Sequence, residues 1–130
     1  YFNGGWKTVL LSGLGAGGKG VFALDVSDPT NHGPTKVLWE YADAADLGYT
    51  VGQPQIARLA SGQWVAIFGN GYNSGNDRAY LYVVDLNSGA VIRKIAAGTG
   101  IITFTVPTGT TSFDQTFNVT APASGTLPST

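Results

Sequence analysis

The sequence predicts an all-β fold: two blades of a β-propeller, followed by a threonine-rich β-strand tail. The main observation is a pattern that occurs twice, in which a tryptophan opens an apolar run, a glycine-rich turn follows, and an apolar strand ends in aspartate. Trp64 follows Trp6 at nearly the spacing at which Asp85 follows Asp25. Repeats of this length, with several short strands and glycine turns in each unit, are typical of propeller blades.

The first repeat, at about residues 1–45, is expected to contain three strands. Trp6–Leu11 is an apolar run that ends at a glycine-rich turn, and Val21–Val26 crowds valine, phenylalanine and leucine into the next strand. A loop with two prolines comes before the third strand, Lys36–Tyr41. A propeller blade has four strands, so this repeat lacks its opening strand.

The second repeat, at about residues 49–98, shows a full set of four strands. Ala42–Gly48 is expected to be a loop, because Gly48 would end any helical turn within a few residues. The predicted hairpins are Pro54–Leu59 with Gln63–Phe68 across Ser61-Gly62, and Ala79–Leu86 with Val91–Ile95 across Asn87-Ser88-Gly89.

The composition changes at about residue 101. Residues 101–130 carry one charged side chain, Asp114, and are rich in threonine, serine and proline, which is typical of a linker or of a β tail. Two segments alternate apolar and polar residues, so either could pair with an unpaired strand edge. The candidate pairing residues are Ile102, Phe104, Val106, Phe117 and Val119.

Length and composition limit the possible functions. The chain has 130 residues, too few at this repeat length for the four or more blades of a closed propeller. It is therefore expected to be part of a larger protein, to complete itself with other chains, or to be a repeat of another architecture. A net charge of −1 with 12% charged residues argues against nucleic-acid binding. Cysteine is absent, and no apolar run is long enough to span a membrane.

Two apparent catalytic or cofactor motifs lack the parts that they need. Gly13–Gly18 matches a dinucleotide-binding pattern, but the following residues form a strand instead of the helix whose N-terminus would hold phosphate, so we interpret the segment as a β-turn. His32 is the only histidine, and no serine nucleophile motif accompanies it. No catalytic or cofactor-binding residue is therefore predicted.

The remaining candidate residues are interpreted mainly as structural. Asp85 and Asn87 begin a weak calcium-loop pattern that has no late bidentate acid, so no metal site is assigned to them. The other aspartates are interpreted as caps of turns and strand ends. The repeat residues expected to define and pack the blades are Trp6, Asp25, Trp39, Trp64 and Asp85, with Trp64 buried between sheets. The glycines expected at turns, some with positive φ, are Gly69, Gly71 and Gly75.

Several segments, in order along the chain, carry a resemblance to a known family. They are WKTVLLSGLGAGGKGVFALDVSDP, VLWEYAD, LGYTVGQPQIARL, WVAIFGNGYNSG and LYVVDLNSGAVIRKI. This series resembles the C-terminal β-propeller of the PilY/PilC family of type IV pilus-associated biogenesis and tip-adhesin proteins. The resemblance implies a secreted, quinoprotein-like and non-enzymatic propeller, here a partial one of two blades, at the outer membrane or pilus (fimbrium), where it acts in pilus biogenesis and cell adhesion. The family's calcium loop follows the GNGYNS blade, whereas this chain continues with ITFTV after Gly100, so no calcium ligands are carried over.

Three functions remain open from the sequence. The first is a non-enzymatic assembly and adhesion module, a propeller scaffold that presents binding loops, whose partners are the rest of a propeller, pilus components or other copies of the chain. The second is a structural subunit that polymerises into an extracellular filament by strand donation. The third is a fragment of a quinone-dependent dehydrogenase, although the acids and quinone-stacking residues of such a site are not found. Protein partners at a bacterial cell surface, without nucleic acid or a transmembrane segment, are expected for the first.

Overall fold

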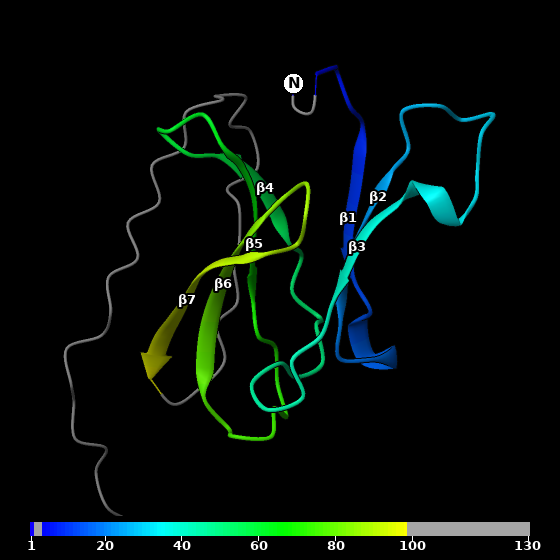
Figure 1. The fold of residues 1–130 in the computed structure, drawn as a ribbon. Coiled ribbons are helices and arrows are strands. Elements are labelled where there is room, and N and C mark those ends of the chain that lie inside the picture. The colour runs from blue at the N-terminus through cyan, green and yellow to red at the C-terminus, as the bar shows by residue number, and fades with distance from the viewer. Residues whose placement is uncertain (2–3, 99–130) are drawn as a thin grey trace, which may run out of the picture.

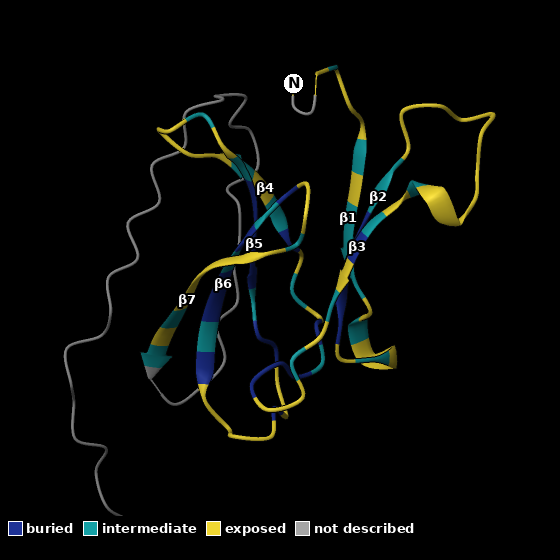
Figure 2. Cartoon of the chain, viewed as in Figure 1, coloured by how far each residue is buried: buried dark blue, intermediate teal, exposed yellow. Residues whose placement is uncertain are grey.

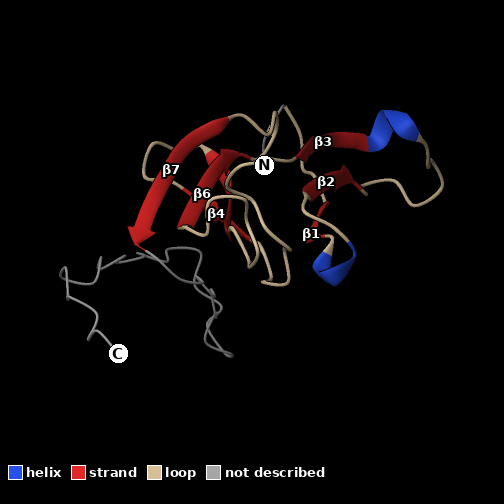
Figure 3. Cartoon of the chain, turned by 90° about the horizontal axis from the view of Figure 1, so that it is seen from below, coloured by secondary structure: helices blue, strands red, loops and turns tan. Residues whose placement is uncertain are grey.

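The computed structural model describes residues 1 and 4–98 and shows two antiparallel sheets that pack against each other (Figure 1). The first sheet has the order β1-β2-β3, with β1 at Val9–Gly13, β2 at Val21–Asp25 and β3 at Val37–Tyr41. The second has the order β4-β5-β6-β7, with β4 at Gln55–Arg58, β5 at Trp64–Gly69, β6 at Ala79–Asp85 and β7 at Val91–Gly98. Viewed from below (Figure 3), the two sheets lie side by side.

The predicted all-β class, with three strands in the first unit and four in the second, is confirmed. Some boundaries differ. The first strand begins at Val9 instead of Trp6, and Lys36 ends a short 3-10 turn, η2 (Pro34–Lys36), because Pro34 favours a turn at that point. A second 3-10 turn, η1 (Gly15–Gly17), lies between β1 and β2. The candidate pairing residues of the tail lie outside the described residues.

The two sheets repeat the same register. Gly13 pairs with Val21 in the first sheet as Gly69 pairs with Leu81 in the second. At the other end of the strands, Val9 pairs with Asp25 as Val65 pairs with Asp85. A register shift follows Ala23 in β2 and recurs after Val83, the matching position in β6. Strands β1–β3 therefore correspond to β5–β7. Strand β4 has no counterpart in the described part of the first sheet.

The same register corrects the alignment of the tryptophans. The N–H of Val26 donates to the carbonyl of Thr8, and the N–H of Leu86 donates to the carbonyl of Trp64, so Trp64 corresponds to Thr8 instead of Trp6. Matching Trp6 with Trp64 was therefore wrong. The turn between β5 and β6 is longer than the equivalent turn between β1 and β2, and aligning the two tryptophans made this difference look smaller than it is. Trp6 is 84% exposed and packs in no blade of the described chain.

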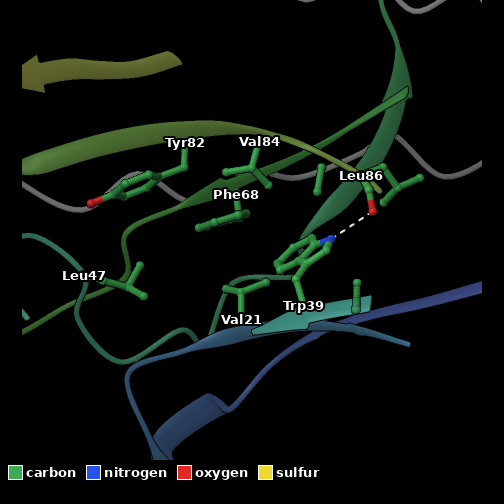
Figure 4. Close-up of a cluster of buried hydrophobic side chains, with 9 residues drawn as sticks. Val21, Trp39, Leu47, Phe68, Tyr82, Val84 and Leu86 are labelled. Carbon is green, nitrogen blue, oxygen red and sulfur yellow. Dashed lines mark hydrogen bonds between the residues drawn. The ribbon is translucent and has the colours of Figure 1, made fainter. Parts of the chain in front are cut away.

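The main core lies between the two sheets (Figures 2 and 4). The first sheet contributes Val21, Ala23 and Trp39, and the second contributes Ala66, Phe68, Tyr82 and Val84. A smaller cluster of Val65, Ile67 and Leu81 lies on the opposite face of the second sheet. Alternating residues of β5 and β6 are thus buried on both faces, which explains their nearly continuous apolar sequences.

Among the described residues, no helix has the length and apolar character needed to cross a membrane.

Candidate functional site

The candidate site lies where the chain passes from the first sheet to the second. We define the crossing segment as residues 42–50, which follow β3, and the β5–β6 loop as residues 70–78. The N–H of Gly48 donates to the carbonyl of Asn70 at 2.7 Å, and the N–H of Tyr49 donates to that of Tyr72 at 2.8 Å. Tyr49 and Tyr72 form an antiparallel β-bridge, and their rings lie 5.3 Å apart. The two most distinctive sequence segments, GYTVGQP and GNGYNS, therefore meet in space.

Glycine is required on both sides of this crossing. A Cβ atom at Gly48 would overlap the carbonyl of Tyr72, and one at Gly71 would overlap the carbonyl of Tyr49. Gly71 also has a φ of +71°, in the region that favours glycine. Of the other predicted turn glycines, Gly69 ends β5, while Gly75 lies in the loop, where a Cβ atom would be 3.1 Å from the carbonyl of Ala45.

Asn70 holds the base of the β5–β6 loop and is fully buried. Its side-chain amide donates to the carbonyl of Asp46 at 2.8 Å and to that of Arg78 at 2.5 Å. Its Oδ1 accepts the N–H of Tyr80 at 3.1 Å. The Asn70 side chain thus supplies hydrogen-bond partners to main-chain groups of both the β5–β6 loop and the crossing segment.

An ionic cluster fastens the crossing segment to the second sheet. We call it the Lys94 cluster; its members are Asp43, Asp46, Asn76, Tyr82 and Lys94. The ammonium of Lys94 donates to Asp43 at 2.9 Å and to Asp46 at 2.5 Å, and it lies 4.7 Å from the ring centre of Tyr80. The Tyr82 hydroxyl donates to Asp43 at 3.0 Å, and the Asn76 amide donates to Asp46 at 2.8 Å.

The electrostatics of the cluster keep its acids ionised. The hydrogen bond from Lys94 lowers the pKa of Asp43, and the bonds from Lys94 and Asn76 lower the pKa of Asp46. Burial raises the pKa of Tyr82, and its bond to Asp43 raises it further. Desolvation opposes the charge of Lys94, but its bonds to the two aspartates outweigh that effect and raise its pKa.

Thr50 joins the crossing segment to the first sheet. Its hydroxyl donates to the carbonyl of Gly20 at 2.7 Å and accepts the N–H of Leu14 at 3.0 Å. Its carbonyl accepts the N–H of Gly15. The glycine-rich segment that matched a dinucleotide pattern is therefore the turn between β1 and β2, with a strand after it.

The strand-ending aspartates play the same part in both sheets. Oδ1 of Asp25 accepts the N–H of Ser27, and Oδ1 of Asp85 accepts the N–H of Asn87. Oδ2 of Asp25 pairs with Lys7, and Oδ2 of Asp85 accepts the amide of Gln63. Both oxygens of Asp85, the weak calcium candidate, are thus engaged, Oδ1 as a turn cap and Oδ2 by the Gln63 side chain. In the described part of the chain, no three histidine, cysteine or acidic residues are grouped to hold a metal ion.

The tryptophans have different environments. Trp39 is 7% exposed, and its Nε1 donates to the carbonyl of Leu86 at 2.8 Å (Figure 4), so its ring joins the two sheets. Trp64 was expected to be buried but is half-buried at the edge of the core, with its Nε1 donating to the carbonyl of Tyr1. Trp64 is the first residue of β5, and part of its ring is left uncovered there.

A cleft of about 320 Å³ opens on the first sheet. It lies beside the turn between β1 and β2 and at the end of β3. Its lining includes Leu14, Lys19, Gly20, Phe22, Glu40 and Tyr41.

The sequence did not reveal the Lys94 cluster. Asp43 was interpreted as a turn cap, and its Oδ1 does accept the N–H of Ala45, but its Oδ2 binds Lys94 from a distant strand. The sequence did contain one pointer to the site, the distinctive segments GYTVGQP and GNGYNS. These are the two segments whose backbones are hydrogen-bonded to each other where the sheets are joined.

Comparison with known proteins gives one family. The family model described as "PilY1 beta-propeller domain" matches residues 1–116. A type IV pilus biogenesis factor PilY1 homolog of Xylella fastidiosa (strain Temecula1 / ATCC 700964) is 52% identical over 103 residues, 78% of this chain and 7% of that protein. Type IV pilus biogenesis factor PilY1 of Pseudomonas aeruginosa (strain UCBPP-PA14) is 52% identical over 97 residues, 73% of this chain and 8% of that protein.

A solved structure agrees. The crystal structure of the Pseudomonas aeruginosa PilY1 C-terminal domain superposes with a TM-score of 0.67 and 49% identity, covering 74% of this chain and 19% of that one. The chain therefore spans less than a tenth of the curated relatives' length and about a fifth of the solved domain.

Proposed function

Because the chain belongs to the PilY1 β-propeller domain family, we propose that it forms adjacent blades of a type IV pilus biogenesis factor and acts by binding proteins, without catalysis. Its place of action in this proposal is the bacterial cell surface or the pilus. The family match and the relatives' names as type IV pilus biogenesis factors support the pilus role. The binding role rests on the β5–β6 loop.

The β5–β6 loop is exposed at its tip yet firmly held at its base. Asn73 and Asp77 have φ values of 59° and 49°, the only positive values among described non-glycine residues. Such conformations persist where surrounding contacts impose them, and they cluster at functional sites. Here the buried Asn70 and the bridge to Tyr49 hold the part of the loop that precedes them. Tyr72 remains 41% exposed beside them, an aromatic side chain presented on a rigid scaffold, as binding loops require.

The acids near the loop support a non-enzymatic role. A general acid or base works best when its pKa lies near the working pH. The pKa values of Asp43 and Asp46 are instead lowered by their bonds to Lys94, which keeps both carboxylates charged and paired. No observation in the described residues favours the quinone-dependent dehydrogenase, and the strand-donation filament depends on residues outside them.

A chimera tests the proposal. The segment of Pseudomonas aeruginosa PilY1 that matches this chain would be replaced by the chain in a strain lacking its own PilY1, and sheared surface pili would be quantified. We expect the chimera to restore pili and the Tyr72→Ala/Asn73→Ala chimera to restore markedly fewer at equal protein level. The matched control is Asn31→Ala/His32→Ala, in the exposed loop between β2 and β3.

Two outcomes would contradict the proposal. A stably produced chimera that restores no pili would refute the assignment as functionally equivalent blades. Full restoration by the Tyr72→Ala/Asn73→Ala chimera would show that the loop tip is not a binding element.

A further inference from the structure

The cleft on the first sheet corresponds, through the internal repeat, to the place on the second sheet where the crossing segment is bound. The N–H of Leu14 donates to the carbonyl of Gly20 at 3.1 Å, and the N–H of Asn70 donates to that of Tyr80 at 3.0 Å. The strand ends that line the cleft and those that hold the crossing segment are therefore equivalent.

The side chains inside the two places also match by register. Phe22 pairs with Glu40 across β2 and β3, and Tyr82 pairs with Lys94 across β6 and β7. Phe22 and Glu40 line the cleft. Tyr82 and Lys94 bind the crossing segment.

On the second sheet this place is filled by a compact part of the crossing segment. Leu47 is fully buried and belongs to the same core cluster as Phe68 and Tyr82 (Figure 4). Asp43 and Asp46, from the same segment, both pair with Lys94. At this position the second sheet therefore binds one apolar side chain, Leu47, and two carboxylates whose charge is opposite to that of Lys94.

On the first sheet the charge at this place is reversed. Glu40 stands where Lys94 stands, and within the described part of the chain it has no ion-pair partner. Phe22 stands where Tyr82 stands and lacks the hydroxyl that donates to Asp43. The cleft's other charged residue, Lys19, is held by the carbonyl of Asn73 at 2.6 Å and, among the described residues, forms no ion pair with Glu40. The cleft therefore suits an apolar side chain flanked by a cation.

We propose that this cleft is the docking site for the crossing segment of a preceding propeller unit, and that this segment carries lysine or arginine where residues 42–50 carry aspartate. The proposal rests on the proposed function, because it requires that the chain be part of a propeller. A second copy of this chain is a poor occupant, since its Asp43 and Asp46 would face Glu40 and are already engaged by Lys94.

Three capped peptides test the charge requirement on the purified 130-residue chain. The first has the native sequence of residues 42–50, the second carries Asp43→Lys and Asp46→Lys, and the third carries Asp43→Asn and Asp46→Asn. Binding is followed by the backbone amide resonances of Leu14, Phe22 and Glu40 in NMR titrations. We expect the lysine peptide to bind about fivefold more tightly than the native peptide, the size of a partly exposed ion pair.

Variants of the chain complete the test. Glu40→Lys should reverse the order of the lysine and native peptides, and Glu40→Gln should abolish the difference between them. Asp77→Asn, which removes an exposed carboxylate elsewhere, should leave the order unchanged. Absence of shifts at the cleft with any peptide, tighter binding of the native peptide by the unaltered chain, or an order insensitive to residue 40 would overturn the proposal. If the peptide titrations fail in this way but the chimera still restores pili, only the docking proposal is refuted and the proposed function stands.

Discussion

The N–H of Gly48 donates to the carbonyl of Asn70 at 2.7 Å, which brings two backbones together with no room for a Cβ atom between them. This contact and the adjoining Tyr49–Tyr72 bridge fix how the first sheet is joined to the second. The Lys94 cluster and the Thr50 hydrogen bonds secure the same segment from either side. Stability and loop geometry should therefore depend strongly on a few residues of this junction.

Replacing Gly71 should be far more damaging than replacing its exposed neighbour. Gly71→Val places a branched side chain at a φ of +71° and against the carbonyl of Tyr49, so we expect a loss of more than about 2 kcal/mol in the free energy of unfolding. Urea denaturation measures the loss. Asn73→Ala, the matched control, is exposed and should cost much less. Equal tolerance of both changes would show that the crossing is not tight.

Asn70→Asp should destabilise the chain although the side chains have nearly the same shape. The change replaces an amide that donates to the carbonyls of Asp46 and Arg78 with a carboxylate that repels them. Leaving buried partners unsatisfied costs about 1 to 3 kcal/mol each, so a loss of at least about 2 kcal/mol is expected in urea denaturation. Asn31→Asp, in an exposed loop, is the control. A loss no larger than in this control would contradict the role assigned to Asn70.

The three tryptophans should differ in energetic importance. Trp39→Ala should cost about 3 to 5 kcal/mol, because it opens a cavity between the sheets and removes the bond to Leu86. Trp64→Ala should cost less, about 1 to 3 kcal/mol, since its ring is half-buried. Trp6→Ala should stay within about 0.5 kcal/mol. Thermal and urea unfolding give the order, and a larger loss for Trp6 than for Trp39 would refute this arrangement of the core.

Asp43 should contribute to stability in a pH-dependent way. Its bond to Lys94 lowers its pKa in the folded state, so its contribution is present above the ordinary aspartate pKa of about 3.9 and is lost as the pH falls through the lowered folded-state value. Asp43→Asn should thus be less stable than the unaltered chain at pH 7, and the difference should shrink on acidification.

Unfolding free energies measured from pH 7 down to pH 2 check this prediction. Asp77→Asn controls for the loss of an exposed carboxylate outside the cluster. The role assigned to Asp43 would be wrong if Asp43→Asn and the unaltered chain showed the same stability at pH 7 and parallel acid profiles.

Much of the fold could be predicted because its signals are local. The strands, their number in each sheet and the loop at residues 42–48 follow from apolar runs bounded by glycine, proline and aspartate. The turn after Asp85 follows from an aspartate that accepts the N–H groups of Asn87 and Ser88. These interactions involve neighbours in the chain, so a short stretch of sequence contains all their partners.

The sequence by itself determined the all-β class, the number of strands in each unit and the family resemblance, because each is carried by short motifs of neighbouring residues. Only the tertiary structure decided that Thr8 and not Trp6 matches Trp64, since strand register is set by hydrogen bonds across the sheet. It also decided that Lys94 meets Asp43 and Asp46, and that Glu40 occupies the equivalent position without a partner. Such pairs join residues far apart in the chain, and their meeting depends on the path of the loop between the sheets.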